Sequence, residues 1–137
     1  MIQEKTFTLK NDISELNSLR EFSEVFGQEN KISNDIINKF QLAFEELISN
    51  IIFYGYDDEL PHQIDVVFTL DGKSMAVRIV DDAKEFNPLA KEDPDISLSI
   101  DERKIGGLGI YLVKSLMDEV NYKRESGKNY FYIKKYF

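Results

Sequence analysis

Two side chains that could bind a metal ion lie four residues apart in a strongly apolar segment. Glu46 and Asn50 fall in a segment where apolar positions recur every three or four residues, after a helix cap at Ser33 or Asn34 and up to the break at Gly55. Residues four apart share one helix face, whereas Glu45 points about 100° away. Burying an unpaired polar group costs about 1–3 kcal/mol, and a hydrated cation would satisfy both side chains. The alternative is that the pair simply faces solvent.

A second candidate is Asp81, which follows an alternating apolar segment at residues 75–80. Strand ends often carry ligand-binding residues, so this carboxylate could accept a hydrogen bond from the amino group of adenine. Taken alone, Asp81 could equally be a turn aspartate that bonds its own backbone.

A glycine-rich run with basic residues before it opens a further apolar helical pattern. Glycines let backbone amides approach phosphates, and a helix N-terminus carries partial positive charge, so the run suits anion binding. It has the spacing of neither a P-loop nor a dinucleotide-binding fingerprint, and by itself it could be only a hinge. The residues concerned are Lys104, Gly106, Gly107, Leu108 and Gly109.

Hairpins and amphipathic helices should position these candidates. Residues 64–70 and 75–79 alternate on either side of Asp71-Gly72, which predicts an antiparallel hairpin, and two more strands flank the polar turn at 126–129. We expect an α+β fold, a two-layer α/β sandwich with a mixed, mostly antiparallel sheet and helices on one face. The remaining expected elements are a strand at 3–10, helices at 13–27 and 110–117, and a long functional or disordered connection at 82–106.

The composition limits the classes of function. A chain of 137 residues, 42% of them hydrophobic, suits one domain, which we place at 1–137. Its net charge of −8 argues against nucleic acid as the main partner, and the absence of cysteine excludes disulfides and thiol chemistry. No segment approaches the roughly 20 apolar residues that span a bilayer, so we expect a cytoplasmic protein without a membrane partner.

In this order, three segments resemble the motifs of the GHKL, or Bergerat-fold, ATPases, and in particular the anti-sigma-factor serine/threonine kinases. The first is Glu46-Leu-Ile-Ser-Asn50 with the following Tyr-Gly-Tyr. The second runs from Asp81 through Ala83 and Phe86 to an Asn-Pro pair. The third and most specific is Gly-Gly-Leu-Gly at 106–109 with the Met-Asp-Glu-Val that closes its helix.

The resemblance implies ATP and Mg²⁺ as ligands and a role for each motif. Asn50 would bind magnesium, Glu46 would act as general base, and Asp81 would recognise adenine. The second motif would bring Ala83 and Phe86 to the nucleotide. The glycine run, with Lys104, would hold the phosphates.

The resemblance also implies a partner, namely a small anti-anti-sigma protein phosphorylated on serine or threonine. Some members of the family bind a sigma factor as homodimers. The alternative is a non-catalytic ATP-dependent anti-sigma or partner-switching module; the retained Glu46 favours a kinase, because a pure binder needs no base. A fragment of a sensor histidine kinase is a third interpretation.

Two positions depart from the family pattern, which usually has His where this chain has Tyr54 and Gly where it has Ala83. A methyl group at Ala83 would weaken nucleotide binding if the backbone there needs positive φ or a close approach to adenine. The single histidine, His62, follows Pro61 in a polar connection, and we interpret it as a solvated turn residue without a role.

Overall fold

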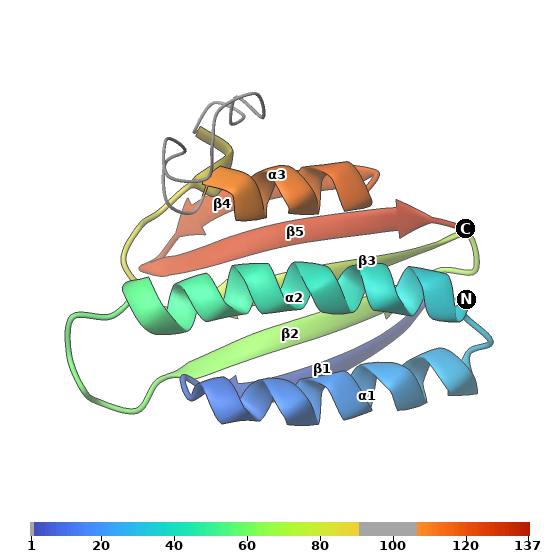
Figure 1. Ribbon diagram of the computed structural model, residues 1–137, viewed down its shortest axis with the longest axis horizontal. Coiled ribbons are helices and arrows are strands. Elements are labelled where there is room, and N and C mark those ends of the chain that lie inside the picture. The colour runs from blue at the N-terminus through green and yellow to red at the C-terminus, as the bar shows by residue number, and fades with distance from the viewer. Residues whose placement is uncertain (1, 91–106) are drawn as a thin grey trace.

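The computed structural model describes residues 2–90 and 107–137 as one antiparallel sheet with helices on one face (Figure 1). The sheet order is β1-β2-β3-β5-β4, and every pairing is antiparallel. The expected two-layer α+β fold is confirmed. The strands are β1 (Gln3–Lys10), β2 (Gln63–Leu70), β3 (Ser74–Asp81), β4 (Glu119–Glu125) and β5 (Lys128–Tyr136).

Three helices lie over the sheet in the order α1, α2, α3 from β1 towards β4 (Figure 1). Of the two expected cap residues, Ser33 caps α2, its side chain accepting a hydrogen bond from the backbone N–H of Ile36 at 3.3 Å. The helices are α1 (Leu16–Glu29), α2 (Asn34–Tyr54) and α3 (Gly107–Leu116), with short 3₁₀ turns η1 (Ile13–Glu15) and η2 (Pro88–Ala90).

The glycine run differs from its expected form. The sequence suggested a glycine turn followed by a helix from Ile110, but α3 begins at Gly107, so Gly107, Leu108 and Gly109 form its first turn. The helix ends at Leu116, and two residues later the N–H of Asp118 donates to the carbonyl of Lys134 in β5 at 2.9 Å.

The core lies between the sheet and the helix layer. Apolar residues alternate along each strand, so one face of the sheet packs on the helices. Phe68 of β2 is fully buried, with its ring centroid 5.2 Å from that of Phe26 and 5.7 Å from that of Phe44. Aromatic contacts of this kind fix both α1 and α2 on the sheet.

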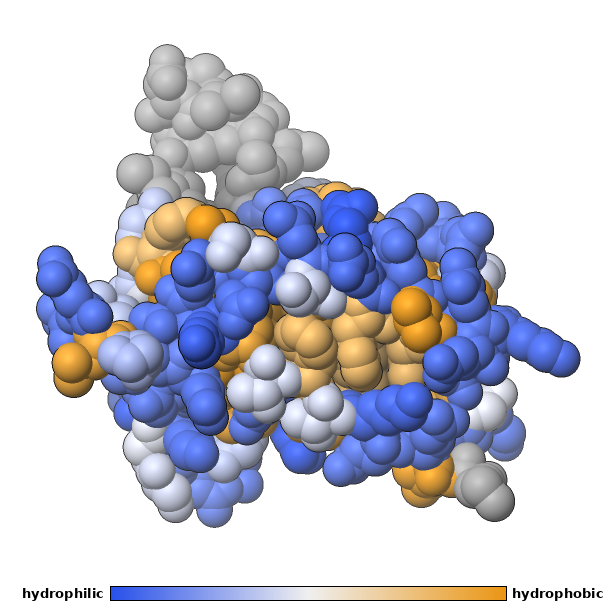
Figure 2. Space-filling view, turned by 90° about the horizontal axis from the view of Figure 1, so that it is seen from below, coloured by the Kyte–Doolittle hydropathy of each residue, from blue (hydrophilic) through white to orange (hydrophobic). Residues whose placement is uncertain are grey.

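The surface combines charged side chains with a restricted apolar area. Figure 2 shows, from below in Figure 1, a pale-orange apolar strip bordered by hydrophilic residues. Partly buried residues of β1 and α1 extend the core outwards, among them Phe7 and Phe22, whose ring centroids are 5.2 Å apart. None of the described helices is long and apolar enough to cross a membrane.

Candidate functional site

The second half of α2 presents Glu46, Asn50 and Tyr54 to one cavity of about 540 Å³. Their spacing of four residues aligns them along one side of the helix, which the apolar residues on the other side fix against the sheet. Glu45 points elsewhere, as expected, and pairs with Arg20 of α1 at 3.1 Å. The cavity is lined by Glu46, Leu47, Asn50, Ile51, Tyr54, Gly55, Asp81, Ala83, Lys84, Glu85, Phe86, Pro88, Gly109, Ile110, Tyr122, Asn129 and Phe131.

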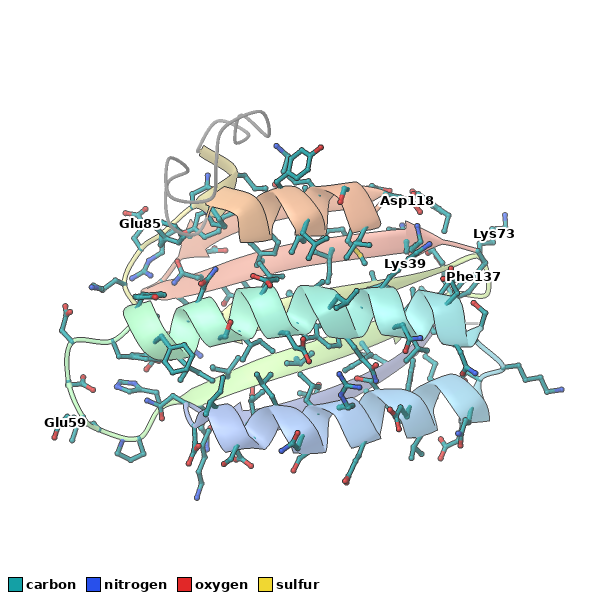
Figure 3. All side chains as sticks on the ribbon, viewed as in Figure 1. Lys39, Glu59, Lys73, Glu85, Asp118 and Phe137 are labelled. Carbon is teal, nitrogen blue, oxygen red and sulfur yellow. The ribbon has the colours of Figure 1, made fainter. Side chains whose placement is uncertain are left out.

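The cavity lies towards the end of the molecule where α2 finishes and β5 begins. Glu85, one of its lining residues, lies at that end, as does Glu59 of the loop after α2 (Figure 3). Lys73, Asp118 and Phe137 lie at the opposite end (Figure 3). Residues distant in the sequence therefore meet at one end of the sandwich.

Asp81 ends β3 inside this cavity and is only 4% exposed. Its Oδ1 accepts hydrogen bonds from the N–H of Ala83 and from Nδ2 of Asn129, both at 2.9 Å. Burial raises the pKa of Asp81 above its ordinary value, against these two hydrogen bonds, which lower it. Among the described residues Oδ2 has no hydrogen-bond partner, so this buried oxygen can accept a bond from a ligand.

Asn129 is the residue of the site that sequence reasoning missed. It lies opposite Asp81 in the β3–β5 pairing and is 6% exposed. Its Nδ2 also approaches the carbonyl oxygens of Ala83, at 3.3 Å, and Lys84, at 2.9 Å. The only sequence signal was a polar residue at the start of an apolar strand, because its partner depends on the strand pairing.

Two further side chains of β4 hold Asn129 in place. The Tyr122 hydroxyl donates to Oδ1 of Asn129 at 2.6 Å, and Nη1 of Arg124 donates to the same oxygen at 3.1 Å. Arg124 also donates to the carbonyl of Ala83 at 2.8 Å. Burial raises the pKa of Tyr122, which keeps its hydroxyl a donor. Residues 81–84 are therefore fixed by a polar network from two strands.

Ala83 does not have the strained backbone that the family's usual glycine would suggest. Its φ is not positive; the positive-φ residues other than glycine in the described chain are Lys31 and Ser126. Its methyl is buried, and a Cβ added at Gly55 would lie 2.8 Å from it. The methyl thus packs beside Gly55, and the positive φ that would weaken nucleotide binding is absent at Ala83.

Gly109 brings the backbone of α3 against the candidate base. A Cβ at this position would collide with Oε2 of Glu46, so only glycine allows α3 to approach the Glu46 carboxylate this closely. The first turn of a helix offers backbone N–H groups and positive potential, which suits phosphate oxygens. Of the expected phosphate residues, Gly107 and Leu108 lie in this turn, whereas Lys104 and Gly106 lie outside the described residues.

The oxygen donors of the cavity suit a magnesium ion that is shared with phosphates and water, and not a metal ion held by protein side chains alone. No group of three or more His, Asp or Glu side chains suited to a metal ion occurs in the described part of the chain. Mg²⁺ in nucleotide sites is held by one or two protein oxygens together with phosphates and water. The Asn50 carboxamide and the Glu46 carboxylate, both partly exposed in the cavity, supply donors of that type.

Residues 9–135 match the family model of the histidine kinase-like ATPase domain. The chain belongs to this family. The serine-protein kinase RsbW of Bacillus velezensis is 30% identical to this ATPase domain over 98 residues, which are 68% of the chain and 61% of that relative. The serine/threonine-protein kinase BtrW of Bordetella bronchiseptica is 24% identical over 89 residues, 65% of the chain and 63% of that relative. The domain thus spans about three fifths of their length.

Solved structures agree on the fold of this ATPase domain. The RsbU and RsbW domains of Rv1364c from Mycobacterium tuberculosis superimpose with a TM-score of 0.70 and 15% identity over 97% of the chain and 32% of that structure. The histidine kinase domain of the Erythrobacter litoralis blue-light kinase gives 0.56 and 11% over 90% of the chain and 59% of that structure. The family resemblance expected from the three motifs is confirmed, and the individual residue roles stay predictions.

Proposed function

We propose that this domain binds magnesium-ATP in the cavity and transfers the γ-phosphate to a serine or threonine of a small anti-anti-sigma-like protein. The observation that carries the proposal is the contact between Glu46 and the first turn of α3 at Gly109, in the cavity that also contains Asn50 and Asp81. A carboxylate beside a phosphate-binding helix end is where a base for an incoming hydroxyl is needed.

Each residue has a defined part in this proposal. The Oδ2 atom of Asp81, which lacks a partner among the described residues, accepts a hydrogen bond from the adenine amino group. Asn50 holds the magnesium ion, which neutralises phosphate charge when bound. The backbone N–H groups at the start of α3 bind phosphate oxygens.

The chemical step is a simple exchange of oxygen atoms on phosphorus. The serine or threonine oxygen of the partner forms a bond to the γ-phosphorus while the bond to the β–γ bridging oxygen breaks, and ADP leaves with that oxygen. Glu46 takes the proton of the attacking hydroxyl. Positioning and electrostatic stabilisation, rather than covalent catalysis, supply the rate.

The proposal is supported by relatives named serine-protein kinase or serine/threonine-protein kinase. A nucleotide-dependent binding module without transfer is the other outcome. It would use the same cavity, and the role of Glu46 separates the two.

The first test is Glu46→Gln, with the neighbouring Glu45→Gln as the matched control. Glu46→Gln should keep ATP affinity in calorimetry yet reduce transfer of labelled γ-phosphate to a purified anti-anti-sigma protein by about 100-fold or more, because general base catalysis contributes on that order. Glu45→Gln should retain transfer, because Glu45 pairs with Arg20 outside the cavity. Undiminished transfer by Glu46→Gln would refute the assigned base.

Asn50→Ala tests the metal in the same titrations. ATP binding by the wild type should strengthen when Mg²⁺ is present, and the variant should lose that gain. ATP binding without any transfer by the wild type would favour the binding module. No binding at millimolar ATP would refute the nucleotide site itself.

A further inference from the structure

A group of ionisable side chains, which we call the His62 cluster, lies beside the nucleotide cavity. Tyr56, Asp58 and His62 come from the loop between α2 and β2, and Asp82 directly follows β3. The Nε2 atom of His62 lies 2.8 Å from Oδ1 of Asp58, and its Nδ1 atom lies 3.1 Å from Oδ2 of Asp82. The His62 side chain is 16% exposed. The expectation of a solvated turn residue is therefore wrong, because the loop folds back onto the end of β3.

Both contacts of the ring are satisfied as hydrogen bonds to ionised carboxylates only when the ring carries two protons. Both nitrogens of His62 face carboxylate oxygens, and an ionised carboxylate only accepts hydrogen bonds. Neutral imidazole has only one N–H donor. The lone pair of its other nitrogen would then point at a carboxylate oxygen, which is also an acceptor. Imidazolium has two donors and satisfies both contacts.

Tyr56 completes the group. Its ring stacks on the imidazole with centroids 4.0 Å apart, and its hydroxyl donates to Oδ1 of Asp82 at 3.1 Å. Asp82 therefore accepts a hydrogen bond on each oxygen, one from Tyr56 and one from His62. Burial, followed by the charges of Asp81 and Asp82, raises the pKa of Tyr56, which keeps the phenol a donor.

The cluster joins the loop after α2 to the cavity segment 81–84. Two other contacts join the same segments: the N–H of Lys84 donates to the carbonyl of Gly55 at 3.0 Å, and Nζ of Lys84 pairs with Asp57 at 3.0 Å. The backbone of His62 is itself anchored, because its N–H donates to Oδ1 of Asn11 at 2.9 Å. The anchored His62 therefore holds Asp82, which directly follows Asp81 in the chain.

We propose that His62, as an imidazolium, is a positioning residue that holds Asp82 and thereby keeps the adjacent Asp81 in place for the base of the nucleotide, so that nucleotide binds more weakly once the ring loses its second proton. This inference rests on the proposed nucleotide site. His62 does not touch the substrate; it acts through Asp82.

The surrounding charges favour the protonated ring. The hydrogen bond to Asp58, then that to Asp82, raises the pKa of His62 above its ordinary value of 6.5. The other ionisable groups facing this region are Asp81 at the end of β3, Asp65 of β2 and Lys128 of β5, which line a small cavity with His62. Two of these three are acidic and favour the protonated ring, whereas Lys128 and the partial burial of the ring oppose protonation.

Because His62 is the single histidine of the chain, proton NMR can follow its ring directly. In the protein without nucleotide we expect the His62 pKa to lie above 6.5, and saturating ATP with Mg²⁺ should raise it further, since coupling between two bound ligands is reciprocal. An increase of about half a unit corresponds to about threefold weaker nucleotide binding by the neutral form. A nucleotide-free pKa at or below 6.5, or one that bound ATP leaves unchanged, would overturn the proposal.

Calorimetry between pH 6 and pH 9 supplies the second readout, with His62→Gln as the comparison. The wild type should lose ATP affinity relative to this variant as the pH rises, because glutamine can donate one hydrogen bond but does not titrate. Parallel affinity profiles for the two proteins would contradict the coupling. Absence of ATP binding at every pH would instead refute the proposed function and, with it, the coupling. In that case the His62 pKa measured without nucleotide would still decide whether the ring is an imidazolium.

Discussion

At the scale of single residues, the site depends on one very close approach. Gly109 in the first turn of α3 leaves space that the Glu46 carboxylate fills. Glu46 is carried by α2 and Gly109 by α3, so the contact joins the expected base to the expected phosphate-binding backbone. A single methyl group added at Gly109 should therefore reduce the rate of phosphate transfer without reducing the stability of the fold.

Gly109→Ala should impair phosphate transfer without destabilising the protein. The new Cβ would displace the flexible end of Glu46, and misplacing a catalytic group by about 1 Å can cost on the order of 100-fold in rate. Alanine is favoured over glycine in a helix by about 1 kcal/mol, so the thermal midpoint should be unchanged or higher. Transfer assays and thermal unfolding measure the two effects, and retained transfer would contradict the assigned contact.

Gly55→Ala is the matched comparison. Its Cβ would lie 2.5 Å from the carbonyl oxygen of Ile51 and 2.8 Å from the methyl of Ala83, which are backbone and buried side-chain atoms that cannot rotate away. Overpacking of this kind costs about 1–3 kcal/mol. This variant should therefore lose stability in denaturant unfolding, which Gly109→Ala should not.

At the scale of elements, the pairing of β3 with β5 builds the floor of the cavity. The pairing sets Asp81 opposite Asn129, and β4 then adds Tyr122 and Arg124 to the same network. The register is fixed over the rest of the strands by apolar pairs such as Ile79 with Phe131. The core packing of the sheet thus determines which donor the buried aspartate receives.

Asn129→Ala should damage both stability and nucleotide binding. Its removal would leave Oδ1 of Asp81 and the Lys84 carbonyl short of a donor, at a cost of about 1–3 kcal/mol. If half of that cost appears in binding, nucleotide affinity should fall about two- to tenfold. Denaturant unfolding and calorimetry measure the two effects. The exposed Asn121→Ala on β4 is the control, and equal behaviour of the two variants would rule out the network.

At the scale of the whole molecule, the site gathers at one end of a sandwich whose helices all cover the same face of the sheet (Figure 1). The end of α2, the end of β3 and the start of β5 converge on the cavity there. The His62 cluster lies beside it and connects the loop after α2 to this end. Protonation of one ring therefore affects how separate parts of the chain are held together.

The midpoint of thermal unfolding should depend on pH through the titration of His62. A group whose pKa is raised by folding stabilises the protein fully below its unfolded value, here 6.5, and loses that contribution as the pH rises through the folded value. Asp58 titrates in the opposite sense, because its hydrogen bond with His62 lowers its pKa below 3.8, so its contribution is lost as the pH falls through that lowered value.

The advantage of the wild type over His62→Gln in thermal unfolding should therefore be largest near pH 6 and shrink towards pH 9 and towards pH 3. Thermal scans across this range measure it directly. An advantage independent of pH would show that His62 contributes through packing alone.

The sequence by itself determined the features that depend on neighbours along the chain. The spacing of Glu46 and Asn50 put both on one face of α2. The hairpin around Asp71-Gly72 formed as expected, with Gly72 at φ 88°, although residues 71–73 connect β2 to β3 in place of the expected two-residue turn. The sequence also predicted that Asp81 ends a strand and that the glycines lie at the start of a helix. Helix periodicity, strand alternation and turn geometry are local properties, so local patterns predict them.

Only the tertiary structure decided what these residues meet. It brought Gly109 against Glu46, put Asn129 opposite Asp81, and gave His62 two carboxylates where the sequence suggested a solvated turn. It also showed the Ala83 methyl packed beside Gly55. Strand order, register and loop position follow from burying the whole core at once, which no short stretch of sequence encodes.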